Sequence, residues 1–283
     1  GAVTGMEPAV REAGIGAAGL VPTLAPTPVT ALKGVGPKLA ERLRRLGLHT
    51  VEDVLLHLPL RYQDRTRLTP LNRLQPGDEV QIEGEVVGSE VTARGRRFLL
   101  CHLSDGSGVL TLRFIHFSPA QEHLFSSPGA RLRCFGEVRQ GYAGLEMIHP
   151  ECRRLGPDTP PVSDRLTPVY PATAGLQQFT LRGLAEQALA HLDAARLLPE
   201  LLPATLRTGL ALMPIAEAVR WLHQPPADAL WAELDSGRHP ARRRLAFEEL
   251  LAHQLSLRRL RTRMQRQAAP ALTGQGGLSQ RFL

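Results

Sequence analysis

The sequence has few cysteines and no long apolar run. Its 283 residues include three cysteines, Cys101, Cys134 and Cys152, which are too scattered for a disulfide framework and lack the paired spacing of a zinc site. We expect buried free thiols in a reducing compartment. No apolar run reaches membrane-spanning length and no secretory signal pattern opens the sequence, so we expect a cytoplasmic protein.

Common catalytic motifs are also missing. The chain contains no Gly-Lys pair and therefore no G-x-x-x-x-G-K-[ST] phosphate loop, and it contains neither G-x-S-x-G nor H-E-x-x-H. Asp78 and Glu79 follow a Pro-Gly turn and are interpreted as turn residues, while the ten histidines are dispersed. We therefore predict that this chain has no catalytic residue, no metal site and no cofactor of its own.

The charge balance points to an anionic partner. Lys and Arg number 34 against 27 Asp and Glu, which gives a formal net charge of +7. Nearly all of the positive charge is arginine, whose planar guanidinium binds phosphate or carboxylate with two hydrogen bonds. Nucleic acid is the favoured partner, and an arginine-rich surface without such a partner is the alternative. The hydrophobic fraction of 43% allows real cores, and the length suits two or three domains.

Patterning along the chain predicts an α+β multidomain protein. A helical region with helix-hairpin-helix-like character precedes a five-stranded OB-fold β-barrel, and a second helical region follows it. The predicted domains are a flexible segment at 1–28, a helical region at 29–75, an OB-fold barrel at 76–155, a Pro-rich strap at 156–178 and a second helical region at 179–283.

The first helical region opens with a Gly-Val-Gly-Pro turn before a short basic helix. Gly34 and Gly36 allow close approach to a phosphate, N–H groups beyond Pro37 point out of a helix N-terminus, and Lys38 lies beside them. Two interpretations are open: a phosphate contact, or a turn that only joins two helices. Thr50 is expected to cap the second helix.

Five strands are predicted in the barrel, with a helix after the third, in the order typical of an OB-fold. Such barrels commonly bind single-stranded nucleic acid, and a barrel without a ligand is the alternative. The strands are expected at 79–92, 97–104, 109–117, 130–140 and 143–154, and the helix at 118–125.

Basic and aromatic residues of the barrel are the candidates for DNA contact. The first hairpin tip carries three arginines next to an aromatic residue, and the third strand alternates so that one face belongs to the core and the other is available for base stacking. A further exposed aromatic is expected in the last hairpin. The candidates are Arg94, Arg96, Arg97, Phe98, Arg113, Phe114, His116 and Tyr142, together with Gly34, Gly36 and Lys38.

The remainder of the chain is predicted to be mostly helical. The last predicted helix is long and basic, and its exposed face is either solvated or directed at DNA or an acidic surface. Helices are expected at 179–194, 198–202, 204–211, 214–222, 226–235 and 240–267.

Six stretches, in order and without large gaps, resemble the N-terminal part of the RecG family of bacterial ATP-dependent DNA helicases. They are LKGVGPKLAERLRRLGLHTVEDVLLHLPLRYQDRT, EGEV, LSDGSGVLTLRF, GEV…GLEMIHPE, LTPVYPATAGL and RHPARRRLAFEELLAHQLSL. The resemblance implies an OB-fold wedge that splits DNA arms while two motor domains, absent here, pull duplex DNA. ATP and Mg²⁺ are implied only for those motor domains.

The resemblance also assigns roles to residues. Family wedges often carry a Phe-Phe pair on the third strand, and the matching pair here is Phe114-Ile115, so Phe114, His116 or Phe117 is expected to stack on bases at the fork. The tip arginines are expected to position the DNA backbone. The HPARRRL stretch is expected to join wedge and motor.

The expected function is binding of replication forks and Holliday junctions, as part of a helicase that reverses stalled forks and drives branch migration. Two alternatives stay open. One is a generic single-strand-binding OB protein, and the other is an interaction scaffold, for example for the tails of single-strand-binding protein. We expect a monomer that does not bind membranes.

Overall fold

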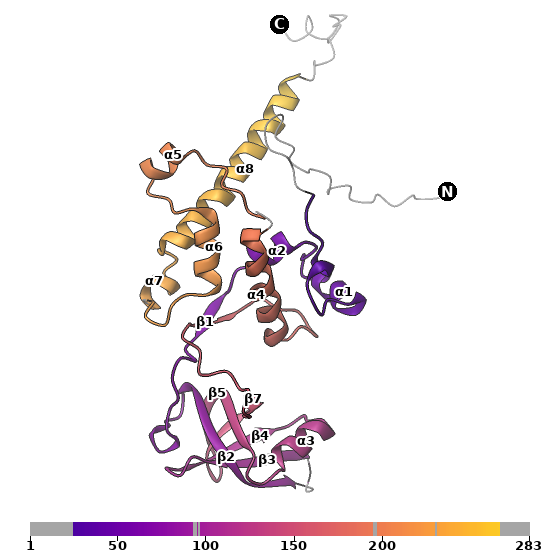
Figure 1. Cartoon of the computed structure of the whole chain (residues 1–283), viewed down its shortest axis with the longest axis vertical. Coiled ribbons are helices and arrows are strands. Elements are labelled where there is room, and N and C mark those ends of the chain that lie inside the picture. The colour runs from indigo at the N-terminus through magenta and orange to yellow at the C-terminus, as the bar shows by residue number, and fades with distance from the viewer. Residues whose placement is uncertain (1–24, 93–94, 96, 195–196, 230, 267–283) are drawn as a thin grey trace, which may run out of the picture.

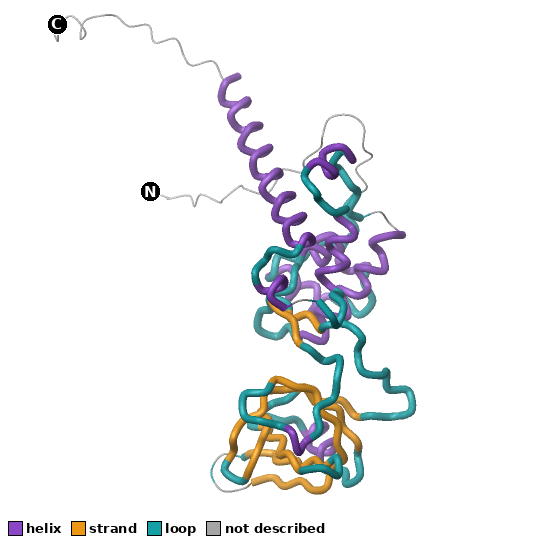
Figure 2. The backbone as a smooth tube through the Cα atoms, turned by 90° about the vertical axis from the view of Figure 1, so that its left-hand side faces the viewer, coloured by secondary structure: helices purple, strands orange, loops and turns teal. Residues whose placement is uncertain are grey.

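The computed structural model describes residues 25–92, 95, 97–194, 197–229 and 231–266 (Figure 1). The predicted flexible segment falls almost entirely on residues outside these ranges, as do Arg94, Arg96 and the end of the second predicted helical region. Within the described part, a β-barrel occupies one end of the molecule and a helical body the other (Figure 2). This arrangement confirms the predicted mixed α+β fold.

The barrel follows the OB-fold strand order. Its strands are β2 (Glu79–Thr92), β3 (Phe98–Ser104), β4 (Val109–Phe114), β5 (Arg131–Gly141), β6 (Gly144–Ile148) and β7 (Glu151–Arg154). They are ordered β2-β3-β4-β6-β5-β7, and an additional pairing of β2 with β5 closes the barrel. Only β4 and β6 pair in parallel; the other pairs in this sheet are antiparallel. Helix α3 (Pro119–Phe125) lies between β4 and β5, as predicted.

Strict alternation of buried and exposed residues builds the barrel core. Leu99, Cys101 and Leu103 of β3 point inward while the residues between them are partly exposed, which is the period of a half-buried strand. Gly84 lies where β2 passes from β5 to β3, and a Cβ there would be 3.1 Å from the Ser104 carbonyl oxygen. Glycine therefore permits the close strand approach that closure requires.

The fifth predicted strand is two strands. The chain breaks at His149, whose φ is +48°, and at Pro150, which has no N–H to donate to a ladder. Residues 144–148 pair with β4 and β5, whereas 151–154 pair with β5 alone as an edge strand. The third predicted strand also ends early, at Phe114 rather than at residue 117.

The helical body is formed by residues that precede the barrel in the sequence together with residues that follow it. Its first part contains a 3-10 turn (Val29–Ala31), α1 (Pro37–Arg45) and α2 (Val51–Leu56), and its second part contains α4 (Gln178–Ala194), α5 (Ala204–Gly209), α6 (Ile215–His223), α7 (Trp231–Asp235) and α8 (Pro240–Arg266). Leu43 and Leu55 from the first part share one core with Leu184 and Val219 from the second. Residues 29–55 of the first predicted region and helices α4 and α6 of the second therefore share one core, whereas Leu71 and Leu74 pack in the barrel.

Caps and prolines explain where these helices begin and end. Thr50 forms the predicted capping box with Asp53, whose carboxylate accepts the Thr50 N–H at 2.9 Å. The predicted helix at 198–202 is absent: the segment is a loop in which the Glu200 carboxylate accepts the N–H of Leu202 and that of Ile215, each at 3.0 Å. The helix predicted from 226 begins at 231, after a turn.

Two chain crossings join the barrel to the helical body. On the way out the chain forms β1 (Arg61–Gln63), and on the way back it forms β8 (Thr167–Val169), which pairs with β1 antiparallel. The predicted Pro-rich strap thus contains a short strand. Figure 2 shows the two crossings as loops between the two bodies.

The second half of helix α8 extends away from the helical body (Figure 1). Its first turns pack on α6 through the buried Ala241 and through Leu245. The side chain of Arg244 is fully buried and pairs with Glu200 at 2.9 Å and with Glu248. Apolar side chains further along the helix are exposed, namely Leu250, Leu255, Leu260 and Met264.

Candidate nucleic-acid interface

Strand register brings several predicted residues to one end of the barrel. Leu99 of β3 lies opposite Phe114, the last residue of β4, and Arg113 lies beside Ile148 near the end of the parallel strand β6. The start of β3 with Arg97 before it, the segment after β4 and the break after β6 therefore meet. We call this region the tip end.

Arg97 is the exposed cation of the tip end within the described part of the hairpin. Its guanidinium lies 5.1 Å from the centroid of the Phe117 ring and donates to Glu122 of α3 at 3.2 Å, with two thirds of the side chain exposed. A cation over an aromatic face is held in place yet keeps its donors near solvent. Arg97 is therefore positioned to contact a phosphate. Arg94 and Arg96 lie outside the described residues.

Phe114 belongs to the core, which corrects the expectation that it is available for base stacking. Its side chain is 3% exposed and stacks on Phe125 of α3 with ring centroids 4.4 Å apart. The cause is the alternation of β4, in which Leu110, Leu112 and Phe114 all point inward. Stacking on a DNA base would require this ring to leave the barrel core.

His116 and His149 form an exposed aromatic surface beside the buried ring. Their rings are stacked with centroids 6.1 Å apart, and both residues are exposed. The Ile115 N–H donates to His149 Nε2 at 3.1 Å, which fixes the segment after β4. From sequence, His149 was one of ten dispersed histidines with no assigned role, so its place at this surface was not predicted. The following proline, which breaks the strand, was the available signal.

Phe98 and Arg113 lie on the outer face of the sheet near the tip end. The Arg113 guanidinium is 5.5 Å from the Phe98 ring centroid and pairs with Glu146 at 2.7 Å. Glu146 is itself largely buried, and the Arg113 side chain is 27% exposed, against 67% for Arg97. Arg113 is thus less available to phosphate than Arg97.

Tyr142 is placed at the opposite end of the barrel. It is fully exposed in the turn between β5 and β6, and β6 starts there and runs parallel to β4 toward the tip end. The structure therefore does not bring Tyr142 together with Arg97 or His116.

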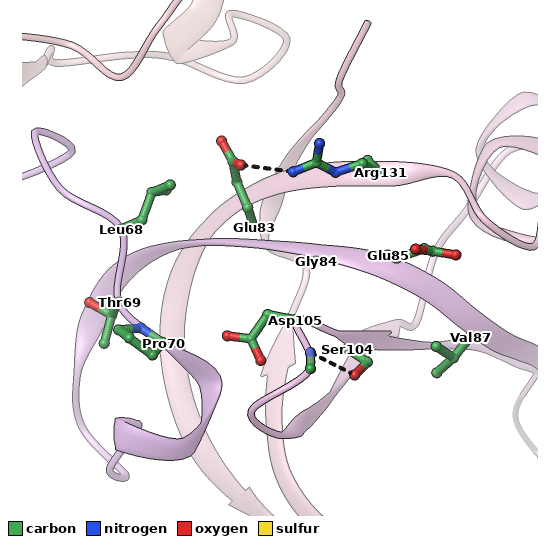
Figure 3. A pocket seen from close by; sticks show the side chains of 11 residues that line it. Leu68, Thr69, Pro70, Glu83, Gly84, Glu85, Val87, Ser104, Asp105 and Arg131 are labelled. Atoms are coloured by element: carbon green, nitrogen blue, oxygen red, sulfur yellow. Dashed lines mark hydrogen bonds and ion pairs between the residues drawn. The ribbon is translucent and has the colours of Figure 1, made fainter.

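An acidic pocket lies away from the tip end, where the loop before β2 passes over β2 and β3 (Figure 3). It has a volume of about 620 Å³ and is lined by Glu83, Glu85 and Asp105, with Arg131 paired to Glu83 at 3.7 Å. Burial disfavours ionisation of Asp105, but hydrogen bonds from Leu71 and the following turn outweigh it and lower the pKa to about 2. Because Glu83 also pairs with Arg133 at 2.7 Å, its charge is compensated, and Glu85 and Asp105 are the carboxylates of this pocket that repel phosphate.

The Gly-Val-Gly-Pro turn lies in the helical body, not at the tip end. Gly34 has a φ of +83°, which favours glycine. The side chain of Gln187 on α4 accepts the Lys33 N–H at 2.7 Å and donates to the Lys33 carbonyl at 3.2 Å. Gly36 and Lys38 are exposed. The turn is thus fastened to α4, and its glycines still face solvent.

Comparison with known proteins identifies the family. A family model described as the RecG wedge domain matches residues 28–192, more than half of the chain. The chain belongs to the RecG wedge family. The match includes the first part of the helical body, the whole barrel and nearly all of α4.

Curated relatives carry the name ATP-dependent DNA helicase RecG. The Escherichia coli K12 relative is 47% identical over 257 residues, covering 90% of this chain and 36% of the relative. The Thermotoga maritima relative is 28% identical, covering 91% of this chain and 32% of the relative. The chain therefore spans about a third of the length of these RecG relatives.

A solved RecG structure has the same fold over most of the chain. It is described as RecG bound to a three-way DNA junction, with a TM-score of 0.63 and 28% identity, covering 86% of this chain and 32% of that one. Among the described residues no helix is long and apolar enough to cross a membrane. Nor do those residues contain a cluster of three or more side chains suited to a metal ion.

Proposed function

We propose that this chain is the branched-DNA-binding wedge of an ATP-dependent DNA helicase of the RecG type. In this proposal the tip end of the barrel lies at the branch point and separates the arms as a motor pulls the duplex. The processes in which this helicase would act are the reversal of stalled replication forks and the branch migration of Holliday junctions. ATP and Mg²⁺ would be used by a motor that this chain does not contain, since the sequence has no phosphate loop.

The proposal rests on the residues that this chain, a member of the RecG wedge family, places at the tip end. Arg97 presents an exposed guanidinium on Phe117, and the stacked pair His116 and His149 lies next to it. Such a combination serves a branch point, because a cation positions the phosphate backbone while flat rings contact unpaired bases. The family relationship and the RecG relative bound to a three-way junction support it.

The distribution of charge also bears on which end of the barrel contacts DNA. The carboxylates of the acidic pocket lie at the far end of β3 from Arg97. Glu85 and Asp105 therefore disfavour a polyanion at the pocket, although Arg131 lies there too, whereas Arg97 offers an exposed guanidinium at the tip end. This distribution of charge supports a contact between DNA and one end of the barrel, rather than a DNA single strand wrapped around the barrel.

The test is binding of the full chain to a fork, a matched duplex and a matched single strand over a range of salt concentrations. We expect preference for the fork and a steep loss of affinity with salt. Arg97→Ala is expected to weaken fork binding and to reduce the magnitude of the salt slope by about 1, as for one lost phosphate contact. Arg73→Ala, at an exposed arginine far from the tip end, is the matched control and should leave binding unchanged.

Two outcomes would contradict the proposal. Equal affinity for the plain single strand would indicate the generic single-strand-binding OB protein. An equal effect of Arg73→Ala and Arg97→Ala would mean that attraction is diffuse and that the tip end is not the contact. Binding to single-strand-binding protein and a monomeric state stay predictions.

A further inference from the structure

Two of the three cysteines lie side by side in the barrel. Cys134 of β5 and Cys152 of β7 are direct cross-strand partners, and their sulfur atoms are 2.7 Å apart, with the Cys152 thiol directed at Cys134. A disulfide bond requires about 2.0 Å between the sulfurs. Only a small side-chain movement therefore separates this thiol pair from a covalent bond.

The ladder places the pair at a position suited to a cross-strand disulfide. The Leu155 N–H donates to the Arg131 carbonyl at 2.8 Å, so that pair is a hydrogen-bonded one. Hydrogen-bonded and non-hydrogen-bonded pairs alternate along an antiparallel ladder, which makes Cys134 and Cys152 a non-hydrogen-bonded pair. Side chains are closest at such pairs, with Cα atoms about 4.5 Å apart, within the range that disulfides span.

We propose that Cys134 and Cys152 are a reversible oxidation site, at which a peroxide or a small disulfide converts the two thiols into a cross-strand disulfide. With hydrogen peroxide, the Cys152 thiol loses its proton, the thiolate attacks an oxygen and breaks the O–O bond, and the products are a sulfenic acid and a hydroxide that takes up the released proton as the first water. The Cys134 thiolate then attacks that sulfur, forms the S–S bond and releases the second water. Two thiols lose two electrons and peroxide gains them.

The third cysteine lies on a different strand and is not a cross-strand partner of either. Cys101 is fully buried on β3, a strand that does not pair with β5 or β7. Cys152 is the less buried residue of the pair, and we assign the first attack to it. Burial raises the pKa of Cys152 well above its usual value and that of Cys101 to about 12. Because the thiolate is the reactive form, disulfide formation should be slow at neutral pH and faster in base.

The bond would fasten the weakest strand of the barrel. β7 pairs with β5 alone and leads directly into the crossing that returns to the helical body. A cross-link at Cys152 holds this strand in place, next to Glu151, which contacts Arg182 of α4. Oxidation should therefore stabilise the barrel and its connection to the helical body.

The experiment treats the reduced full chain with hydrogen peroxide at pH 8, then alkylates it under denaturing conditions without reductant. We expect alkylation of one cysteine in place of three, a mass lower by two hydrogens, and restoration of three after dithiothreitol. Trypsin cuts after Arg133, Arg139 and Arg153, so the product should contain peptide 134–139 linked to peptide 140–153. The melting temperature should rise on the order of 5 °C on oxidation.

Cys101→Ala is the matched control and should still form the bond, whereas Cys152→Ser should remain without it and show no rise in melting temperature. Three alkylated cysteines after peroxide treatment would overturn the proposal. So would a link that involves Cys101, or a sulfinic acid at Cys152 without any cross-linked peptide. The peptide map of the peroxide-treated chain without substitutions distinguishes these outcomes, even where a variant folds poorly.

Discussion

Arg182 of α4 donates to a carboxylate oxygen of Glu151 on β7 at 3.2 Å, linking the helical body to the barrel. The same carboxylate accepts from Arg65 at 2.7 Å, and the Arg65 guanidinium lies 4.2 Å from the Phe135 ring centroid. Both arginine side chains are mostly buried. This cluster holds the barrel against the helical body at the point where the two chain crossings meet it.

Glu151→Gln should loosen that connection. Burial disfavours the charged carboxylate, but the two arginines outweigh it and hold the pKa of Glu151 below its usual value. A lowered pKa stabilises the fold above the unfolded value of about 4.3, and this contribution is lost as pH falls. Because Glu151 is half exposed, we expect a loss of about 1 kcal/mol at pH 7. Urea unfolding at pH 7 and pH 4 measures it.

The control for this change is Glu137→Gln, at an exposed pair with Arg139 in the same barrel. It should alter the free energy of unfolding by less than about 0.5 kcal/mol. Limited proteolysis of 155–166 should accelerate for Glu151→Gln alone. Equal effects of both substitutions would show that the connection does not depend on this carboxylate.

Gly34→Ala and Gly183→Ala should have opposite effects on stability. Gly34 has a φ of +83°, which costs a residue with a Cβ about 1 kcal/mol or more. Gly183 lies within α4 with open space around it, so alanine there should stabilise by about 0.5–1 kcal/mol. Thermal unfolding of both variants tests the pair. Loss of fork affinity in Gly34→Ala without loss of stability would instead assign the turn to a phosphate contact.

Phe114→Ala should damage the fold rather than a DNA contact alone. The buried ring stacks on Phe125, and removal of such a ring costs about 3–5 kcal/mol. His116→Ala, at an exposed neighbour, should change stability by less than about 0.5 kcal/mol and should weaken fork binding. Urea unfolding and fork titration of both variants separate the roles. A stable Phe114→Ala that no longer binds forks would return this residue to the interface.

Acid should destabilise the helical body through His223. The ring is 2% exposed; its Nε2–H donates to the Leu55 carbonyl at 2.8 Å, and its Nδ1 accepts from the Tyr170 hydroxyl at 2.7 Å. Burial lowers the pKa of His223, so the unfolded chain takes up a proton that the folded one resists. Stability should therefore fall as pH drops below about 6.5.

The measurement is the melting temperature at pH 7.5 and pH 5.5. His223→Asn lowers stability at both values but should show a smaller difference between them than the unsubstituted chain. The exposed His123→Asn serves as control and should keep the full difference. An unchanged difference in His223→Asn would locate the acid sensitivity elsewhere.

Local patterns predicted local structure well. The capping box at Thr50, the alternation along β4 and the helix after it follow from neighbouring residues, and each is present. What failed depends on contacts distant in sequence. The buried face of Phe114 was one of two possibilities, because alternation does not say which face is core. The pairing of Arg61 with Val169 and the burial of Arg244 likewise arise from residues far apart in the chain.

The insertion of the barrel within the helical body has a consequence for synthesis on the ribosome. All strands of the barrel have been made once residue 154 emerges, so it can fold while the chain is still growing. Leu43 and Leu55 must wait for Leu184 and Val219 before their core exists. A nascent chain halted near residue 175 would therefore display a finished barrel beside uncovered apolar helices, which is the stage most in need of a chaperone.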